Sequence, residues 1–150
     1  MDESKRRQIV SIIDDVDDMT IATVRHDGYP QATTVSYVND GMTIYFGTAA
    51  NSQKAKNIAS NNRVSLTINR DYSDWSEIEG LSVAGLATPV TDPVEQERIG
   101  GMMFAKFPEI ADYIPADTAS DELALFRIDP QFISLLDYRK GFGHCELIEV

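Results

Sequence analysis

Hydrophobic residues first recur with the period of an α-helix and then with the period of a β-strand. Over residues 4–16 the apolar positions lie three and four apart, which predicts an amphipathic helix that covers a core. From residue 19 onward apolar and polar positions alternate, and β-branched residues become frequent. The chain is therefore expected to begin with one covering helix and to continue mainly as β-sheet.

Short alternating segments separated by turn residues predict the strands. The Asp27-Gly28 and Asp40-Gly41 pairs are typical of tight hairpins, so the first three strands are expected to form an antiparallel meander. The predicted strands are residues 19–25, 29–38, 42–48, 63–70, 81–92, 123–129 and 132–138. The segments expected to be loops are residues 71–80 and 111–121.

Two more helices are expected at connections between strands. One covers residues 52–60, with Asn51 or Ser52 as its N-cap. The other begins at Asp92, which is its expected N-cap, and runs toward residue 110. In the first of these helices the residues expected to face the core are Ala55, Ile58 and Ala59.

About seven mostly sequential strands and three short helices predict an α+β fold in which an antiparallel β-barrel dominates. Closure, complete or split, removes the exposed edges of an antiparallel sheet. Gly85 is expected at a bend or bulge and Pro89 at a strand edge or end, and barrels turn corners with such residues. No repeat or change of composition marks a boundary, so residues 1–150 are expected to form one domain.

The net charge argues against several classes of partner. The 150 residues include 24 acidic and 13 basic side chains, a formal net charge of −11. Nucleic acids and acidic membranes attract proteins through lysine and arginine, so neither is an expected partner. An anionic ligand would need a locally positive site, because the field of the whole protein repels it.

Cysteine and histidine are too few for the common metal sites. Cys145 is the only cysteine, so no intrachain disulfide and no cysteine cage for zinc can form. The chain has only two histidines, His26 and His144, and no metal site is expected. No stretch is apolar enough to span a membrane and no export signal is evident, so a soluble protein of the cytoplasm is expected.

The segment FGTAANSQKAKN, residues 46–57, carries a candidate anion site. The hydroxyls of Thr48 and Ser52, the free N–H groups of a first helical turn and the ammonium of Lys54 could converge on one phosphate. The alternative is that Lys54 and Lys56 are ordinary solvated lysines. Spacing selects Lys54 for the candidate site and leaves Lys56 on the surface.

Two further features suit a ligand site. Trp75 lies in a polar loop, where it is a contact between subunits, an aromatic wall of a ligand site or an anchor of its own loop. The segment DYRKGFGH, residues 137–144, combines aromatic, cationic and glycine residues directly after a strand. It is either a polar turn or a place where the backbone approaches a flat ligand. No catalytic motif is present, so no residue is assigned as a catalytic acid, base or nucleophile.

Three segments in order carry a resemblance to a known family: MTIATVRHDGYPQATTVSYV, MTIYFGTAANSQKAKNIASNNRVSLTI and GLATPVTD. They resemble the pyridoxamine 5'-phosphate oxidase-like family of FMN-binding split barrels, from about residue 5 to residue 150. The most specific part is the corner FGT at residues 46–48 followed by SQK at residues 52–54. The resemblance implies a split barrel of six to seven strands and a homodimer with two equivalent flavin sites at the subunit interface.

The resemblance also implies which residues would contact FMN. One strand would run beside the isoalloxazine ring, largely through its backbone groups, and the corner would hold the ribityl phosphate. The ring-side residues are Thr33, Thr34, Val35 and Ser36, and the phosphate-side residues are Thr48, Ser52, Gln53 and Lys54. Phe46 would lie near the ring or the ribityl chain. The segment 137–144 would also reach toward the flavin, through Lys140, Phe142 and His144. Trp75 is the candidate aromatic wall of the site.

The expected function is that of an FMN-dependent oxidoreductase with an unknown small-molecule substrate or electron donor. Family members often have arginine where Gln53 stands, so the phosphate grip would be less cationic here. The chain lacks the Arg-Leu-x-Pro ending of the vitamin B6 oxidase, which argues against vitamin B6 as the substrate. Two alternatives stay open: a non-catalytic module that stores flavin or senses redox state, and a binder of a deazaflavin or of haem, with His144 as a haem ligand.

Overall fold

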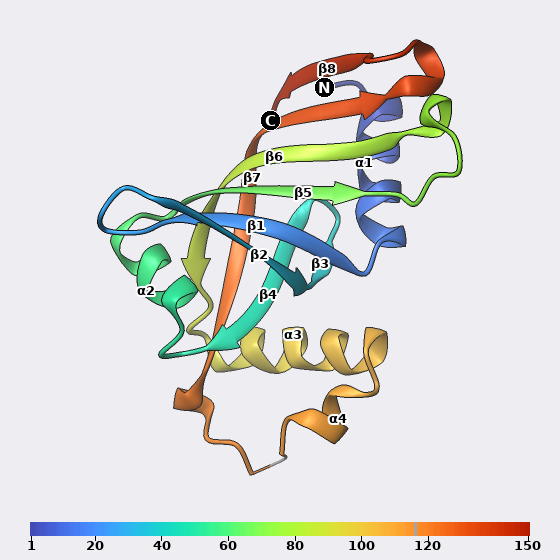
Figure 1. Ribbon diagram of the computed structural model, residues 1–150. Coiled ribbons are helices and arrows are strands. Elements are labelled where there is room, and N and C mark those ends of the chain that lie inside the picture. The colour runs from blue at the N-terminus through green and yellow to red at the C-terminus, as the bar shows by residue number, and fades with distance from the viewer. Residues whose placement is uncertain (116) are drawn as a thin grey trace.

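Eight strands form one antiparallel sheet in the computed structural model, which describes residues 1–115 and 117–150. The strands are β1 (Asp18–Val24), β2 (Pro30–Ser36), β3 (Val38–Asp40), β4 (Thr43–Ala49), β5 (Arg63–Asn69), β6 (Glu79–Pro89), β7 (Leu123–Asp137) and β8 (Cys145–Glu149). The helices are α1 (Glu3–Asp15), α2 (Gln53–Ser60), α3 (Pro93–Lys106) and α4 (Ile110–Tyr113), and the 3-10 turns are η1 (Trp75–Glu77), η2 (Ser120–Glu122) and η3 (Tyr138–Lys140). The predicted α+β class, with the sheet dominant, is confirmed (Figure 1).

The sheet curls into a split barrel whose two ends belong to one chain segment. Its strand order is β2-β1-β5-β6-β7-β4-β3, and β8 pairs with β7 off this path. The first and last strands of that order, β2 and β3, follow each other directly in the chain. Their junction at Tyr37 therefore brings the two ends of the sheet together, and Figure 1 shows the end of β2 beside β3. The predicted split barrel is confirmed.

The segment 29–38, predicted as one strand, is broken at Tyr37. β2 pairs with β1 and β3 pairs with β4, so both predicted hairpins exist but share no single middle strand. Tyr37 is fully buried, and its hydroxyl donates a hydrogen bond to the carbonyl oxygen of Ile13 at 2.7 Å. This anchor holds the chain where it changes partners, and it depends on α1, which the local pattern could not show.

The segments 123–129 and 132–138, predicted as two strands, form the continuous strand β7. The register between β6 and β7 shifts between Ala84 and Gly85, where Pro130 lies opposite Gly85. A proline is tolerated at such a bulge because the ladder is already interrupted there. A Cβ at Gly85 would lie 2.9 Å from the nearest side-chain atom, so this position requires glycine, and the predicted bulge is confirmed.

The later helices and the last strand differ partly from expectation. α3 begins as predicted, with Asp92 as its N-cap accepting the N–H of Val94 at 3.2 Å, but it ends at Lys106. The expected loop 111–121 contains part of α4 and of η2. β8 was not predicted, and it pairs with the second half of β7.

Helices cover the core from two sides. α1 contributes Ile9, Ile12 and Ile13, none of which has exposed surface. A second, smaller cluster joins α3 to β4 and includes Ile99 and Tyr45. In Figure 1, α1 lies beside the β5 and β6 ends of the sheet, and α3 crosses below β4.

Lys106 fastens the end of α3 to the corner at Tyr37. Its ammonium donates hydrogen bonds to the carbonyl oxygens of Val16 and Tyr37, each at 3.0 Å. It also lies 4.2 Å from the centre of the Tyr37 ring, within the range of a cation–π contact. Burial lowers the pKa of Lys106, and these carbonyl oxygens take the place of the water it loses.

Replacing Lys106 with methionine is expected to lower the free energy of unfolding by about 2 kcal/mol, because two carbonyl groups lose a charged donor. Urea unfolding followed by circular dichroism measures the change. Lys56→Met is the matched control, since Lys56 is exposed on α2. Equal stability of the two variants would show that the Lys106 contacts contribute nothing.

Candidate functional site

Hydroxyl groups build the turn between β4 and α2. Ser52 is the N-cap of α2, as predicted, and its Oγ accepts the N–H of Ala55 at 3.1 Å. The Thr48 hydroxyl at the end of β4 donates to the same Oγ at 3.0 Å. The other N–H groups of a first helical turn have no acceptor within the helix, and they carry its positive end. The corner therefore offers donors to a ligand.

A small pocket opens at this corner, and we call it the corner pocket. Its volume is about 200 Å³. Its lining residues are Thr23, Gln31, Thr33, Ser52, Gln53 and Lys54. β1, β2 and α2 thus contribute to one site, which joins Thr33 to the phosphate-side residues predicted around Ser52. Hydroxyl, amide and ammonium groups suit an anion with several acceptor oxygens.

Lys54 is the charged group of the corner pocket. Its side chain is half-buried, whereas that of Lys56, two residues further along α2, is exposed. Burial lowers the pKa of Lys54. Within residues 1–115 and 117–150, no acidic side chain forms an ion pair with Lys54. A partly dehydrated cation with no acidic partner is stabilised by a bound anion.

Asn57 is a site-forming residue that the sequence analysis missed. It is 1% exposed, and its amide donates to Thr23 Oγ1 at 3.0 Å and to Gln31 Oε1 at 3.1 Å. Its Oδ1 accepts the Gln53 amide at 2.8 Å. Asn57 therefore fixes α2 against two strands and orients Gln53. The prediction placed Ala59 on the buried face, but Ala59 is exposed and Asn57 is buried in its stead.

β2, expected beside a flavin ring, is mostly exposed. Thr33, Thr34 and Ser36 are exposed, and only Gln31 and Val35 are half-buried. Val35 packs against the main core. A strand at the end of the sheet order with one face exposed can present its backbone and side chains to a flat ligand.

Phe46 lies inside the core rather than in the corner pocket. It is fully buried, and its ring stacks on Phe126 with the centroids 5.5 Å apart. It therefore supports β4 from within, two residues before Thr48. The lining of the corner pocket does not include it.

Trp75 and Phe142 meet at the end of the sheet opposite α2. Trp75 lies in η1, Phe142 lies between β7 and β8, and their rings stack with centroids 6.0 Å apart. Tyr138 packs edge-on against Phe142 at 5.4 Å. Trp75 is 65% exposed and Phe142 is 77% exposed, so the pair forms an open aromatic surface. A hollow of about 550 Å³ lies beside it.

Lys140 and His144 belong to the same connection and both contact Glu146. His144 Nε2 lies 3.1 Å from Glu146 Oε1, and Lys140 Nζ lies 3.6 Å from the same oxygen. β5 runs from α2 toward η1 (Figure 1), and its 7 residues span about 20 Å at the usual strand rise. Within one protomer these two residues and Trp75 therefore lie far from the corner pocket.

An ionic network built on two buried carboxylates ties this connection to α1. Asp137 is 3% exposed and accepts Arg139 Nε at 2.9 Å. Gln8 of α1 donates to Asp137 Oδ2 at 3.0 Å and to Glu79 Oε2 at 2.8 Å. Arg139 also pairs with Glu79. The hydrogen bond from the Arg139 side chain lowers the pKa of Asp137 to about 2, against the effect of burial.

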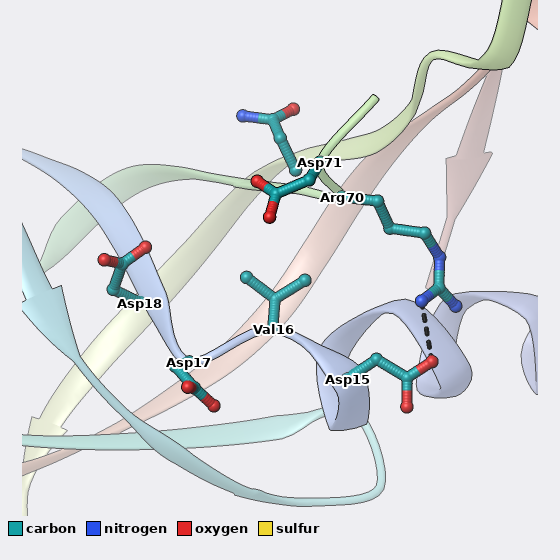
Figure 2. Close-up of a pocket in the computed structure, with 7 residues that line it drawn as sticks. Asp15, Val16, Asp17, Asp18, Arg70 and Asp71 are labelled. Atoms are coloured by element: carbon teal, nitrogen blue, oxygen red, sulfur yellow. Dashed lines mark hydrogen bonds and ion pairs between the residues drawn. The ribbon is translucent and has the colours of Figure 1, made fainter. Parts of the chain in front are cut away.

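An acidic pocket of about 480 Å³ lies between the end of α1 and the end of β5. Figure 2 shows Arg70 directed at Asp15, with Asp17, Asp18 and Asp71 around the opening. Arg70 Nη1 is 2.6 Å from Asp15 Oδ2, so its charge is already neutralised. Excess carboxylates repel a phosphate. In the part of the chain that the structure describes, no group of three or more histidine, cysteine or acidic side chains is placed to hold a metal ion.

Comparison with known proteins gives one family match. A family model described as Pyridoxamine 5'-phosphate oxidase matches residues 6–137. No curated protein matches the sequence. None of the helices within residues 1–115 and 117–150 combines the length and the apolar character needed to cross a membrane.

Several solved structures share the fold. The conserved hypothetical protein Rv2991 of Mycobacterium tuberculosis is 27% identical, with a TM-score of 0.77 over 100% of this chain and 92% of that chain. A candidate pyridoxamine 5'-phosphate oxidase of Listeria innocua is 22% identical, with a TM-score of 0.72 over 89% of this chain and 98% of that one. HutZ, the haem storage protein of Vibrio cholerae, is 20% identical, with a TM-score of 0.68 over 85% and 89%.

Proposed function

Because the chain belongs to the pyridoxamine 5'-phosphate oxidase family, we propose that it binds FMN, with the phosphate in the corner pocket and the ring along β2. The observation that carries the proposal is Lys54, a half-buried cation without an acidic partner in the described part of the chain. The other groups that line the corner pocket are neutral and polar. A phosphate would provide the missing charge and accept several hydrogen bonds.

Each residue of the corner has a separate part in holding the phosphate. Lys54 contributes the charge, and the first-turn N–H groups of α2 contribute the positive end of the helix. The Ser52 hydroxyl already accepts two hydrogen bonds, from Ala55 and Thr48, so its own proton is available to a phosphate oxygen. Asn57 acts indirectly, because it keeps α2 and Gln53 in place.

We further propose that the protein is an oxidoreductase that acts on a small molecule. Bound FMN supplies hydride or electron transfer. The chain binds and orients the cofactor, and the exposed groups of β2 meet the polar edge of the ring. No titratable side chain lines the corner pocket apart from Lys54, so the protein's part is positioning and local positive charge.

A homodimer would complete the site. One protomer alone leaves most of β2 exposed and leaves Trp75 and Phe142 exposed about 20 Å from the corner pocket, the length of β5. In a twofold arrangement, the aromatic surface of one protomer can cover the β2 strand of the other. Lys140 and His144, which the family resemblance directs toward the flavin, would then approach it from the partner.

The test of the proposed function compares FMN with riboflavin, which lacks the phosphate. Quenching of flavin fluorescence on titration with the protein measures both affinities. FMN is expected to bind at least about tenfold more tightly, because only FMN can use the charged corner. Equal affinities would remove the corner pocket from the proposal, and no saturable binding of either flavin would overturn it.

Haem is the second candidate ligand, and the likeness to a haem storage protein favours testing it. His144 is the residue that could bind iron, but its Nε2 already contacts Glu146 at 3.1 Å. Titration with haemin, followed by absorption spectroscopy, separates the two ligands. A shifted haem spectrum that His144→Ala abolishes would favour haem.

For a flavin-loaded protein, the absence of turnover with any reduced nicotinamide would favour storage or sensing over catalysis.

A further inference from the structure

A second hollow adjoins the corner pocket, and we call it the apolar hollow. Its volume is about 330 Å³, and it lies between the ends of β2 and β4, the helices α3 and α4, and the start of β7. Thr48 lines the apolar hollow, Ser52 lines the corner pocket, and the two hydroxyl oxygens lie 3.0 Å apart. One hydrogen bond therefore separates the two spaces.

β2 connects the same two spaces along its length. Thr33 lines the corner pocket and Ser36 lines the apolar hollow. Three residues of a strand span about 10 Å, comparable with the length of three fused six-membered rings. Side chains three residues apart point to opposite faces of a strand, so a flat ring with its phosphate in the corner pocket would reach the apolar hollow along the free edge of β2.

The walls of the apolar hollow carry no charge. The apolar residues that form most of them are Met103, Phe107, Ile110, Ile114, Leu123 and Leu125. Hydroxyl groups occur only on the strand side, at Ser36 and Thr48, because the Tyr37 hydroxyl points to the Ile13 carbonyl. Ile114 is 37% exposed and Leu123 is 39% exposed, so this surface is not sealed into the core.

We propose that the apolar hollow binds a small, neutral and mainly apolar molecule, the substrate that meets the flavin ring. The volume and the apolar lining with a few polar groups at one end are typical of ligand pockets. A phosphorylated or carboxylated substrate would lose its hydration there without gaining a partner among the lining side chains. The nearby ammonium of Lys106, over the rings of Tyr37 and Phe107, is already held by two carbonyl oxygens. The placement next to the ring rests on the proposed function, whereas the binding of an apolar molecule does not.

The test uses N-phenyl-1-naphthylamine, a neutral aromatic probe whose fluorescence rises in apolar surroundings. The full chain is expected to bind it at one saturable site. Leu123→Glu is expected to weaken binding at least about tenfold, because a carboxylate would enter the apolar hollow. Leu147→Glu is the matched control, since Leu147 is a strand leucine that is 75% exposed and lies outside the apolar hollow. Ile114→Glu tests the opposite wall and replaces Leu123→Glu if that variant does not fold.

The outcomes separate the two proposals. Saturable probe binding that Leu123→Glu and Ile114→Glu weaken, and Leu147→Glu does not, supports the apolar hollow even if FMN fails to bind. A change in probe affinity when FMN is bound supports its position beside the ring. Equal probe affinity in all variants overturns the inference while leaving FMN binding intact. Dissociation of a dimer by Leu123→Glu, seen by sedimentation, overturns it too, because the surface would then be an interface between copies.

Discussion

Replacing Lys54 with alanine is expected to weaken FMN binding by about 1–3 kcal/mol, the range for hydrogen bonds assisted by charge. The loss is large because Lys54 is the charged side chain of the corner pocket. The remaining hydroxyl and amide groups can hold a phosphate but cannot neutralise it. Flavin fluorescence quenching measures the change in dissociation constant.

Two controls show whether the loss comes from the phosphate. Lys56→Ala removes a lysine from the same helix, but this side chain is exposed, so FMN affinity should change little. Riboflavin should bind Lys54→Ala and the natural chain equally well, because it carries no phosphate. If Lys54→Ala weakens FMN and riboflavin alike, the lysine supports the fold of the corner rather than the phosphate.

Replacing Asp137 with alanine is expected to lower the free energy of unfolding by about 2 kcal/mol, because it removes a buried carboxylate that accepts hydrogen bonds from a charged group. Arg139 would lose its partner at 2.9 Å, and Gln8 would lose one of its two acceptors. Asp129→Ala is the matched control: Asp129 also pairs with an arginine two residues away, Arg127, but its side chain is 41% exposed. Asp129→Ala should lower the free energy of unfolding by at most about 1 kcal/mol. Similar losses in the two variants would contradict the importance of burial.

The same carboxylate gives stability a defined dependence on pH. The pKa of Asp137 falls from 3.8 to about 2 in the folded protein, so folding favours the ionised form. This stabilisation is complete above pH 4 and is lost as the pH falls toward 2, by up to about 2 kcal/mol. Asp137→Asn should therefore lose less stability than the natural chain between pH 5 and pH 2. Parallel losses in urea unfolding would show that Asp137 is not the responsible group.

Local sequence patterns predicted most of the secondary structure, because the features that start, shape and end these segments lie within the segments themselves. The period of the first helix, the Asp-Gly turns and the cap at Ser52 are local features, and each appears in the structure. The break at Tyr37 could not be predicted, because it depends on a hydrogen bond to Ile13 in a distant helix. The continuous strand β7 was missed for a related reason. Pro130 normally ends a strand, but here it lies opposite the bulge at Gly85.

The candidate site was predictable where one segment supplies it and not where several segments meet. Thr48, Ser52 and Lys54 lie within seven residues of sequence, and the structure places them around one corner. Gln31 and Asn57 were missed, because an amide shows its role only when its partners are known. Phe46 follows the pattern of a site residue but lies in the core. The apolar hollow was invisible in the sequence, since its apolar walls read as ordinary core positions.

The pairing of β4 with β7 has a consequence for how the protein is made. Ile44 pairs with Ile128, and Ala49, which lines the apolar hollow, pairs with Leu123. Such distant partners slow folding, because a long loop must close before the contacts form. During synthesis on the ribosome, the edge of β4 that pairs with β7 therefore stays unpaired until β7 has emerged. We expect a nascent chain that ends before β7 to lack a formed corner, so that binding of the proposed FMN follows synthesis rather than accompanying it.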